Sequence, residues 1–208
     1  MARPKNTAAR RAQIVDGFLA VLAQRGYDGA AMTAVAEAAG LTAGLIHYHF
    51  HDKEAVLVAA VEALGARHLA RLDAALDAAG APPARLAAFI DAHLGLGAHA
   101  DPEALACWLA IGSEAARRPA VAAPYREVLA ALQARLRTII DAGVEAGAFA
   151  PDDPGAAATA LLAVVQGYFT LAATAPTLIP RGTAAASTAA MARGVLRMQD
   201  ELPLRTPE

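Results

Sequence analysis

The sequence predicts an all-α protein of about nine helices. Alanine, the strongest helix former, dominates long stretches of the 208 residues, and apolar side chains recur three and four positions apart. Glycine and proline separate these stretches at intervals that suit helices joined by short turns. With 56% hydrophobic and 18% charged residues the chain has ample material for a buried core, and it shows no alternating strand pattern.

The first helix is expected from Ala8 to Arg25. Its apolar residues Ile14, Phe18 and Leu22 lie four positions apart and therefore share one face. Gly26 follows at once, and glycine is the residue that ends helices most readily because it adopts left-handed backbone angles without steric cost.

The next stretch predicts two short helices joined by a glycine turn. Thr33 precedes an apolar run and is expected to cap the first of these helices through its hydroxyl, and Gly40 is expected to end it. Thr42 offers a second cap, and a short helix should follow from Ala43 to Phe50. Two short helices in this arrangement are typical of the helix-turn-helix motif that reads DNA.

The second short helix has two different faces. Ile46 and Phe50 lie four positions apart and should anchor it to the core. The opposite side combines small residues with polar aromatic ones, namely Ala43, Gly44, His47 and Tyr48. Such a surface suits a DNA groove, which exposes base edges between two phosphate backbones. The free N–H groups at the start of the helix, beside Thr42, can bind a phosphate.

A DNA-binding chain needs local positive charge, because the net charge here is only −2. Cations gather near the N-terminus, where only Asp16 opposes them. Arg10 and Arg11 open the first helix and are expected to meet phosphate groups. For Arg3 and Lys5 a solvated tail is an equally good interpretation.

The segment LTAGLIHYHFHDKEAVL, preceded by RGYDGAAMTAVAEAAG, resembles the N-terminal domain of the tetracycline-repressor (TetR) family of bacterial regulators. The residues that match the family pattern are Thr42, Gly44, Ile46, Tyr48, His49, Phe50 and Lys53. The resemblance implies that Tyr48, His49 and Lys53 contact phosphates while the helix 43–50 enters the major groove. Two residues depart from the pattern: His47 stands where a tyrosine is usual, and Leu45 stands where a small hydroxyl residue is common. Leu45 can still touch a thymine methyl group. The complete expected DNA-binding set is Arg10, Arg11, Thr33, Thr42, Ala43, Gly44, Leu45, His47, Tyr48, His49 and Lys53.

A domain boundary is expected after residue 52, which divides the chain into a DNA-binding domain, 1–52, and a helical ligand-binding and dimerisation domain, 53–208. Asp52 should cap a long helix that runs from Lys53 to about Ala79, where the AGAPP segment stops it. The further helices are expected at about Ala84–Ala98, from Asp101 and Pro102 onward, at Ala120–Gly147, from Asp153 and Pro154 to about Ala173, and at Ala184–Met198.

No charged side chain occurs between Asp153 and Arg181, and this stretch is longer than the roughly 20 apolar residues that a helix needs to cross a membrane. Its alanine-rich composition is only mildly hydrophobic, and Gln166 lies in its middle. We therefore expect no membrane contact and interpret the segment as a buried helix at a subunit interface. Small residues spaced three or four apart would let two helices approach closely there: Ala156, Ala160, Ala163 and Gly167.

No catalytic motif, metal-ligand spacing or cofactor-binding motif is present, so we expect neither catalytic nor metal residues and no cofactor. The single cysteine, Cys107, excludes an internal disulfide and fits a reducing cytoplasm. A buried thiol that packs as a small hydrophobe is the commoner interpretation of such a residue.

The second domain does contain candidates for a small-molecule pocket, which mix apolar bulk with a few polar groups. They are Phe89, His93, Leu96, Trp108, Ile111, Glu114, Tyr125, Gln166, Tyr168 and Phe169. For any single one of them an ordinary core position is the commoner alternative. His93 and Glu114 would be the most informative if both are buried, because buried polar groups need partners.

The resemblance to the TetR family implies an effector that loosens DNA binding. With it, these observations predict a cytoplasmic homodimer that binds a palindromic double-stranded DNA operator and represses transcription until a small organic effector, apolar or weakly polar, enters. The helix from Lys53 to Ala79 is expected to transmit effector binding to the DNA-binding domain by changing the separation of the two helix-turn-helix motifs, the reading heads of the dimer. Two alternatives remain open: a ligand-binding helical dimer with a vestigial DNA-binding head, and an unrecognised enzyme.

Overall fold

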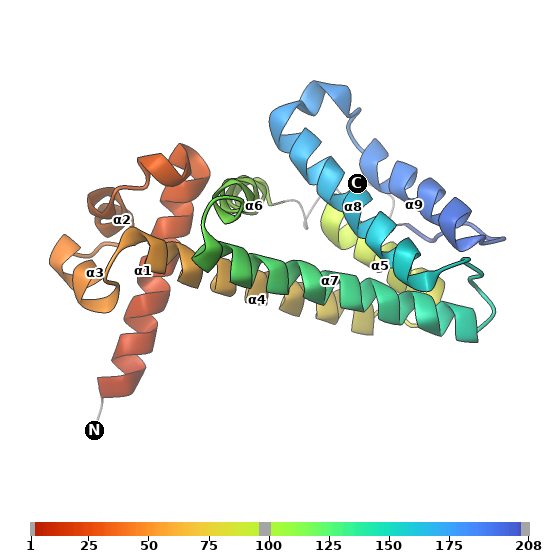
Figure 1. Ribbon diagram of the computed structural model, residues 1–208, viewed down its shortest axis with the longest axis horizontal. Coiled ribbons are helices and arrows are strands. Elements are labelled where there is room, and N and C mark those ends of the chain that lie inside the picture. The colour runs from red at the N-terminus through yellow and green to blue at the C-terminus, as the bar shows by residue number, and fades with distance from the viewer. Residues whose placement is uncertain (1–2, 96–100, 205–208) are drawn as a thin grey trace. The chain divides into compact units, whose positions relative to one another are not determined.

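The computed structural model describes residues 3–95 and 101–204, with side chains from residue 7 onward. Within those ranges it contains nine α-helices, one short 3-10 helix and no strand, so the predicted all-α class is confirmed (Figure 1). The bounds are α1 Arg3–Gly29, α2 Met32–Ala38, α3 Ala43–His49, α4 Lys53–Asp77, α5 Pro82–Leu94, α6 Pro102–Ala115, α7 Pro119–Glu145, α8 Pro154–Thr174, η1 Pro176–Leu178 and α9 Thr183–Leu196.

The chain packs as two compact units that do not follow a single cut in the sequence. The first unit comprises residues 1–67 and 102–128, and the second comprises residues 68–101 and 129–208. The limits of the units therefore fall inside α4 and inside α7. Each of these helices contributes side chains to both hydrophobic cores, as Val61 and Leu72 of α4 illustrate.

α1 is longer than the sequence predicted. Gly26 interrupts it, with φ 66° and ψ −178°, as expected for a terminating glycine. A second short helical stretch follows up to Gly29, so the expected end of the first helix at Gly26 is confirmed, while its start lies earlier than the expected Ala8.

The prediction that Thr33 caps α2 was also wrong. α2 begins at Met32, its N-cap is Ala31, and no side chain bonds to its free N–H groups. Backbone hydrogen bonds from Ala31 N to Gly29 O and from Ala30 N to Tyr27 O make the turn. The helix therefore starts two residues earlier than the capping rule suggests, and Thr33 is exposed.

The turn between α2 and α3 agrees with the sequence. Gly40 has φ 63°, the left-handed value that ends a helix, and Leu41 N donates to Ala36 O. Thr42 caps α3, since its hydroxyl accepts a hydrogen bond from Leu45 N over 3.3 Å. α1, α2 and α3 pack against one another (Figure 1).

α4 starts where it was predicted to start. The Asp52 carboxylate accepts a 2.8 Å hydrogen bond from Ala55 N and so caps the helix. Its inward face is completely buried in the first core through Val56, Leu57, Ala60 and Val61. The helix ends at Asp77, just before the segment in which Gly80 has φ 76°.

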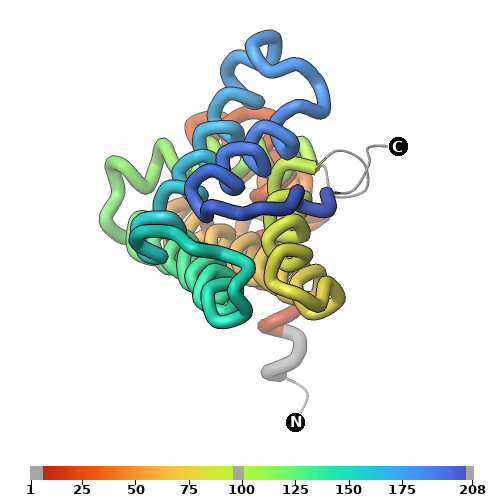
Figure 2. Tube along the Cα trace, turned by 90° about the vertical axis from the view of Figure 1, so that its right-hand side faces the viewer, coloured from red at the N-terminus to blue at the C-terminus, as the bar shows by residue number. Residues whose placement is uncertain are grey.

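The second unit is built from α5, α8, α9 and the adjoining parts of α4 and α7. α5, α8 and α9 pack on one another, and Figure 2 shows α8 and α9 running alongside each other. The Asp153 carboxylate caps α8 as predicted, accepting hydrogen bonds from Gly155 N and Ala156 N. α5 ends at Leu94, and the rest of the predicted helix to Ala98 reaches residues outside the described ranges.

Candidate nucleic-acid interface and ligand residues

α3 presents the face that the sequence predicted. Ile46 is completely buried and Phe50 is 3% exposed, and both belong to the first core. On the other side Tyr48 is 75% exposed, and His47 and Gly44 are also exposed. An exposed tyrosine on a firmly anchored short helix leaves its ring and hydroxyl free for an external partner.

The start of α3 is open to close approach. A Cβ atom built on Gly44 would meet nothing within 4 Å, so no neighbour in the chain requires glycine at this position. Ala43 and Leu45 are half-buried, and the Thr42 hydroxyl is already bonded to Leu45 N. The first turn of α3 is therefore a smooth surface with N–H groups and no bulky side chain at its centre.

Arg11 holds the other end of α3. Its guanidinium donates a 2.6 Å hydrogen bond to the backbone carbonyl of His49 and lies 4.0 Å over the Phe50 ring. The rings of Tyr48 and His49 meet edge to face, with centroids 5.1 Å apart. The structure thus gives Arg11 a bond within the protein at the position where the sequence predicted a phosphate contact.

Arg10 remains on the surface, where its guanidinium donates to the Gln13 side-chain oxygen over 2.7 Å. Gln13 in turn donates to the carbonyl of Ala39, over 2.7 Å, and so ties α1 to the end of α2. Sequence reasoning missed Gln13, because a bond between residues 26 positions apart leaves no local pattern.

Lys53 is engaged within the protein as well. Its ammonium donates to the carbonyl of Tyr27 over 2.5 Å and to that of Asp28 over 3.4 Å, and it lies 4.1 Å from the centre of the Tyr27 ring. Burial lowers the pKa of Lys53, partly offset by the nearby Asp28 carboxylate.

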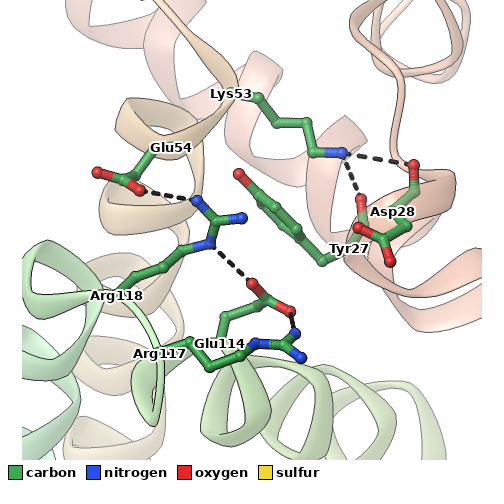
Figure 3. Close-up of polar contacts among 7 residues, drawn as sticks. All are labelled: Tyr27, Asp28, Lys53, Glu54, Glu114, Arg117 and Arg118. Atoms are coloured by element: carbon green, nitrogen blue, oxygen red, sulfur yellow. Dashed lines mark hydrogen bonds and ion pairs between the residues drawn. The ribbon is translucent and has the colours of Figure 1, made fainter.

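The charged residues around Tyr27 form a cluster that the sequence did not predict (Figure 3). Arg118 donates to Glu114 over 2.8 Å and to Glu54 over 3.0 Å, and Arg117 also bonds to Glu114. Arg117 and Arg118 follow the end of α6 at Ala115, and their spacing of three and four residues from Glu114 is the signal that could have found these two pairs. The bond to Glu54 spans 64 residues and has no such signal.

The predicted ligand residues are divided between the two units. Trp108, Ile111, Glu114 and Tyr125 belong to the first unit, and Phe89, His93, Gln166, Tyr168 and Phe169 belong to the second. Leu96 lies outside the described residues. Two hollows, of about 250 and 540 Å³, are lined by residues of α1, α2 and the turn after α2, and neither includes a predicted ligand residue.

In the first unit the predicted ligand residues sit against the core. Ile111 is completely buried, and the rings of Trp108 and Tyr125 lie 6.1 Å apart at a tilt of 46°. Glu114 is only 4% exposed. Burial raises its pKa, but hydrogen bonds from Arg118 and Arg117 outweigh burial and leave the pKa below its usual value.

In the second unit His93 lies at the centre of an aromatic group. Its ring stacks on Phe89 at 4.4 Å and meets the Phe169 ring edge-on at 6.1 Å. Nδ1 of His93 lies 2.7 Å from the Phe89 carbonyl, so this nitrogen carries the hydrogen and donates it. Nε2 of His93 is then an acceptor, 3.0 Å from Nε2 of His68, which donates.

Burial keeps both imidazoles of this pair neutral. The pKa of His93 is lowered to about 3, mainly by burial, and that of His68 is lowered to about 4 by burial together with the cations Arg71 and Arg135. His93 and Glu114 are both buried, but they belong to different units and each has its own hydrogen-bond partners.

The small residues predicted to form a subunit interface are all exposed on α8: Ala156, Ala160, Ala163 and Gly167. α8 is long and apolar enough to cross a membrane by length and composition, which alone is weak evidence for a span, and 22% of its most apolar window is buried within the chain. Apolar residues of α9 are exposed too, with Met191 at 42% and Val195 at 41%. A Cβ atom on Gly167 or on Gly194 would meet nothing within 4 Å.

Comparison with known proteins adds two matching family models. One, for bacterial regulatory proteins of the tetR family, matches residues 14–60, and the other, for the C-terminal part of BetI-type transcriptional repressors, matches residues 82–198. The HTH-type transcriptional regulator BetI of Rhizobium meliloti (strain 1021) is 32% identical over 160 residues, which cover 77% of this chain and 76% of that protein.

Solved structures share the fold. A transcriptional-regulator structure from Saccharomonospora viridis in complex with choline has a TM-score of 0.78 at 21% identity, covering 92% of this chain and 97% of that one. The regulator FadR of Bacillus subtilis in complex with stearoyl-CoA has a TM-score of 0.71 at 19% identity, covering 89% and 97%.

Proposed function

Since this chain belongs to the TetR family of bacterial regulatory proteins, with a BetI-type C-terminal domain, we propose that it represses transcription as a homodimer on a palindromic operator. Like its relatives, it is a helix-turn-helix transcriptional regulator. The observation that carries the proposal is the outward face of α3, on which Tyr48 and His47 are exposed while Ile46 and Phe50 hold the helix from behind.

The α3 face suits the major groove. Leu45, His47 and Gly44 are proposed to face base edges, where Leu45 can touch a thymine methyl group and Gly44 lets the backbone approach. Tyr48 and His49, together with the N–H groups beside Thr42 and Ala43, are proposed to meet phosphates.

Three cations extend the proposed phosphate contacts. Arg10 is exposed on α1 and needs only to exchange its bond with Gln13 for a phosphate. Lys53 uses two of its three donors on the carbonyls of Tyr27 and Asp28, which leaves one donor for DNA. Arg11 contributes its remaining donors and, through the His49 carbonyl, fixes the end of α3.

Selection of bound sequences from random duplexes tests this function. A dimer with two reading heads should enrich a palindrome with half-sites about one helical turn, or a multiple of it, apart. If no sequence is enriched above unrelated duplexes at low salt, operator binding is wrong.

The homodimer is proposed to form through α8 and α9. The exposed small residues on α8, such as Ala160 and Gly167, and the exposed Met191 and Val195 on α9 form apolar surface that a single chain leaves in water. Glycine inside a helix costs about 1 kcal/mol relative to alanine. No neighbour within the chain requires glycine at residue 167, and close approach of a second copy accounts for it.

The effector is proposed to be a small organic molecule of apolar or weakly polar character, bound by the second domain. Phe89, His93 and Phe169 offer ring surfaces, and the His68–His93 pair offers neutral hydrogen-bonding groups. Structural neighbours bind choline in one case and stearoyl-CoA in another, so this fold accepts quite different ligands. Since burial and the cations Arg71 and Arg135 keep His68 neutral, this pair carries no negative charge that would attract a cationic effector.

Titration of the protein with choline and with stearoyl-CoA, followed by the fluorescence of Trp108, tests the effector class. We expect no response to choline up to millimolar concentration. A saturable response to choline that also releases the operator would overturn the effector class and leave the DNA-binding proposal intact.

Release is proposed to act through α4, which contributes to both cores, with Leu57 in the first and Leu72 in the second. A shift of this helix changes the separation of two α3 helices in a dimer. A hundredfold loss of operator affinity requires a coupling free energy of about 2.7 kcal/mol between effector and operator sites. A regulator of transcription acts where the chromosome is, and we therefore propose a cytoplasmic location.

A further inference from the structure

Tyr27, in the last turn of α1, lies between two cations. The Lys53 ammonium is 4.1 Å from the centre of its ring, and the carbon of the Arg118 guanidinium is 4.7 Å from the same point (Figure 3). Tyr27 is 9% exposed, so both cations meet its ring largely away from water, where such contacts are stronger. The position of Tyr27 therefore depends on both partners.

Arg118 has little freedom of its own. Its Nε donates to one oxygen of Glu114 over 2.8 Å, and one terminal nitrogen donates to Glu54 over 3.0 Å. Glu114 is 4% exposed, and its hydrogen bonds with the two arginines keep it ionised despite burial. A planar guanidinium held by two carboxylates presents its face to Tyr27 in one defined orientation.

The cluster lies at the junction that places α3. Lys53 and Glu54 are the first two residues of α4, and only residues 50–52 separate them from α3. Lys53 binds the carbonyls at the end of α1, and Glu54 binds Arg118 beside α7. The first turn of α4 is thus held on one side by α1 and on the other by Arg118.

We propose that Arg118 is a positioning residue for operator binding, acting through Tyr27 and the first turn of α4 rather than through a phosphate contact. By fixing the Tyr27 ring and Glu54, it keeps Lys53 and the end of α3 in the geometry that the duplex requires. This inference rests on the proposed operator binding.

A plain charge effect would give Arg118 a different signature. A cation near DNA that contacts a phosphate contributes about 0.9 to the slope of log affinity against log salt concentration. A lysine in its place would restore that contribution, because the charge is retained. If Arg118 is a positioning residue, its replacement leaves the slope of log affinity against log salt concentration unchanged. Lysine then does not restore the affinity, because the planar guanidinium with its several donors is required.

The experiment measures the affinity of the full-length protein for its selected operator at several salt concentrations. Arg118→Gln should weaken binding about tenfold at every salt concentration, within the range that coupled contacts show. Arg118→Lys should bind almost as weakly. An ammonium has no planar group that bonds to both Glu114 and Glu54 while it lies against the Tyr27 ring. Arg117→Gln is the matched control: it makes the same change of charge one residue earlier, at a side chain bonded to Glu114 alone, and should bind as the wild type does.

A second series tests the path through Tyr27. In a Tyr27→Leu background, which is itself expected to bind weakly, Arg118→Gln should add less than a twofold loss, since the ring through which it acts is gone. If circular dichroism shows that Arg118→Gln is unfolded, the Glu54→Gln variant tests the inference instead. Glu54 is half-exposed, so this change removes a partner of Arg118 without leaving a gap in the core. It should lower affinity about threefold with the salt slope unchanged.

Unchanged affinity of folded Arg118→Gln or, where that variant is unfolded, of Glu54→Gln overturns the inference. A loss that Arg118→Lys restores, together with a slope reduced by about one, assigns Arg118 to phosphate contact instead and overturns it as well. A wild-type protein that selects no operator would refute the proposed function itself, before any variant is compared.

Discussion

The Arg11 guanidinium donates a 2.6 Å hydrogen bond to the backbone carbonyl of His49, which is the last residue of α3. The last carbonyls of a helix have no partner within the helix, and a cation at that end also offsets the helix dipole. Arg11 is therefore placed to stabilise the C-terminal end of the helix that is proposed to read DNA.

Replacing Arg11 should affect folding and binding together. Arg11→Gln removes the bond to His49 and the contact with the Phe50 ring, so we expect a loss of about 1 kcal/mol in the free energy of unfolding. Operator affinity should fall with it. Arg10→Gln is the matched control, since it removes the same charge from an exposed pair and should weaken binding without lowering stability. Chemical unfolding and operator titration distinguish the two, and equal stability losses would contradict the assignment.

Gly44→Ala should separate stability from function. Alanine meets no neighbour at this position and is the better helix former, so the free energy of unfolding should stay the same or rise by up to about 1 kcal/mol. Operator affinity should fall, because the added methyl group occupies the space proposed for the duplex. A Gly44→Ala variant that is as stable as the wild type or more so, and binds the operator with full affinity, would contradict the proposal that the α3 backbone approaches the duplex closely at Gly44.

Charged residues on α8 should yield monomers. A glutamate at Ala160 together with one at Gly167 places two charges in the apolar surface proposed for a second copy, where unpaired charges are costly. Light scattering should show a monomer. Glutamate at Ala66, an exposed residue of α4, is the control and should leave the dimer intact. A dimer that survives both changes on α8 would place the subunit interface elsewhere.

The buried histidine pair should make stability depend on pH in a particular direction. The pKa values of His68 and His93 are lowered by burial to about 4 and about 3, so the unfolded chain binds protons more readily than the folded chain. The stabilisation is fully present above the unfolded pKa of about 6.5 and is lost as the pH falls towards 4. Urea unfolding at pH 7 and pH 4.5 measures the free energy of unfolding at each pH, and its decrease between the two should be smaller for His68→Gln than for the wild type. An equal decrease in both proteins would contradict the lowered pKa of His68.

The local features of α3 could be predicted from the sequence because short-range rules decide them. Gly40, Thr42, Ile46 and Phe50 act within one or two turns of helix, and the structure confirms each of them. The cap assigned to Thr33 was wrong because a backbone turn, closed by hydrogen bonds from Ala30 N to Tyr27 O and from Ala31 N to Gly29 O, precedes α2 and sets where it begins.

The contacts that hold the reading head could not be predicted. Arg11 meets His49 across 38 residues, and Arg118 meets Glu54 across 64 residues. The pairing of His68 with His93 in the second unit, across 25 residues and two helices, could not be predicted either. A composition or spacing pattern does not encode such pairs, since only the packed fold brings them together.

The most direct test of the proposed DNA-reading face compares the sequences selected from random duplexes by the wild type and by His47→Ala. We predict that the wild type selects a palindrome, and that His47→Ala selects the same palindrome with preference lost at one position in each half-site, where discrimination of about 1–3 kcal/mol disappears. An unchanged motif, or loss of preference at every position alike, would contradict the claim that the exposed side of α3 reads the bases.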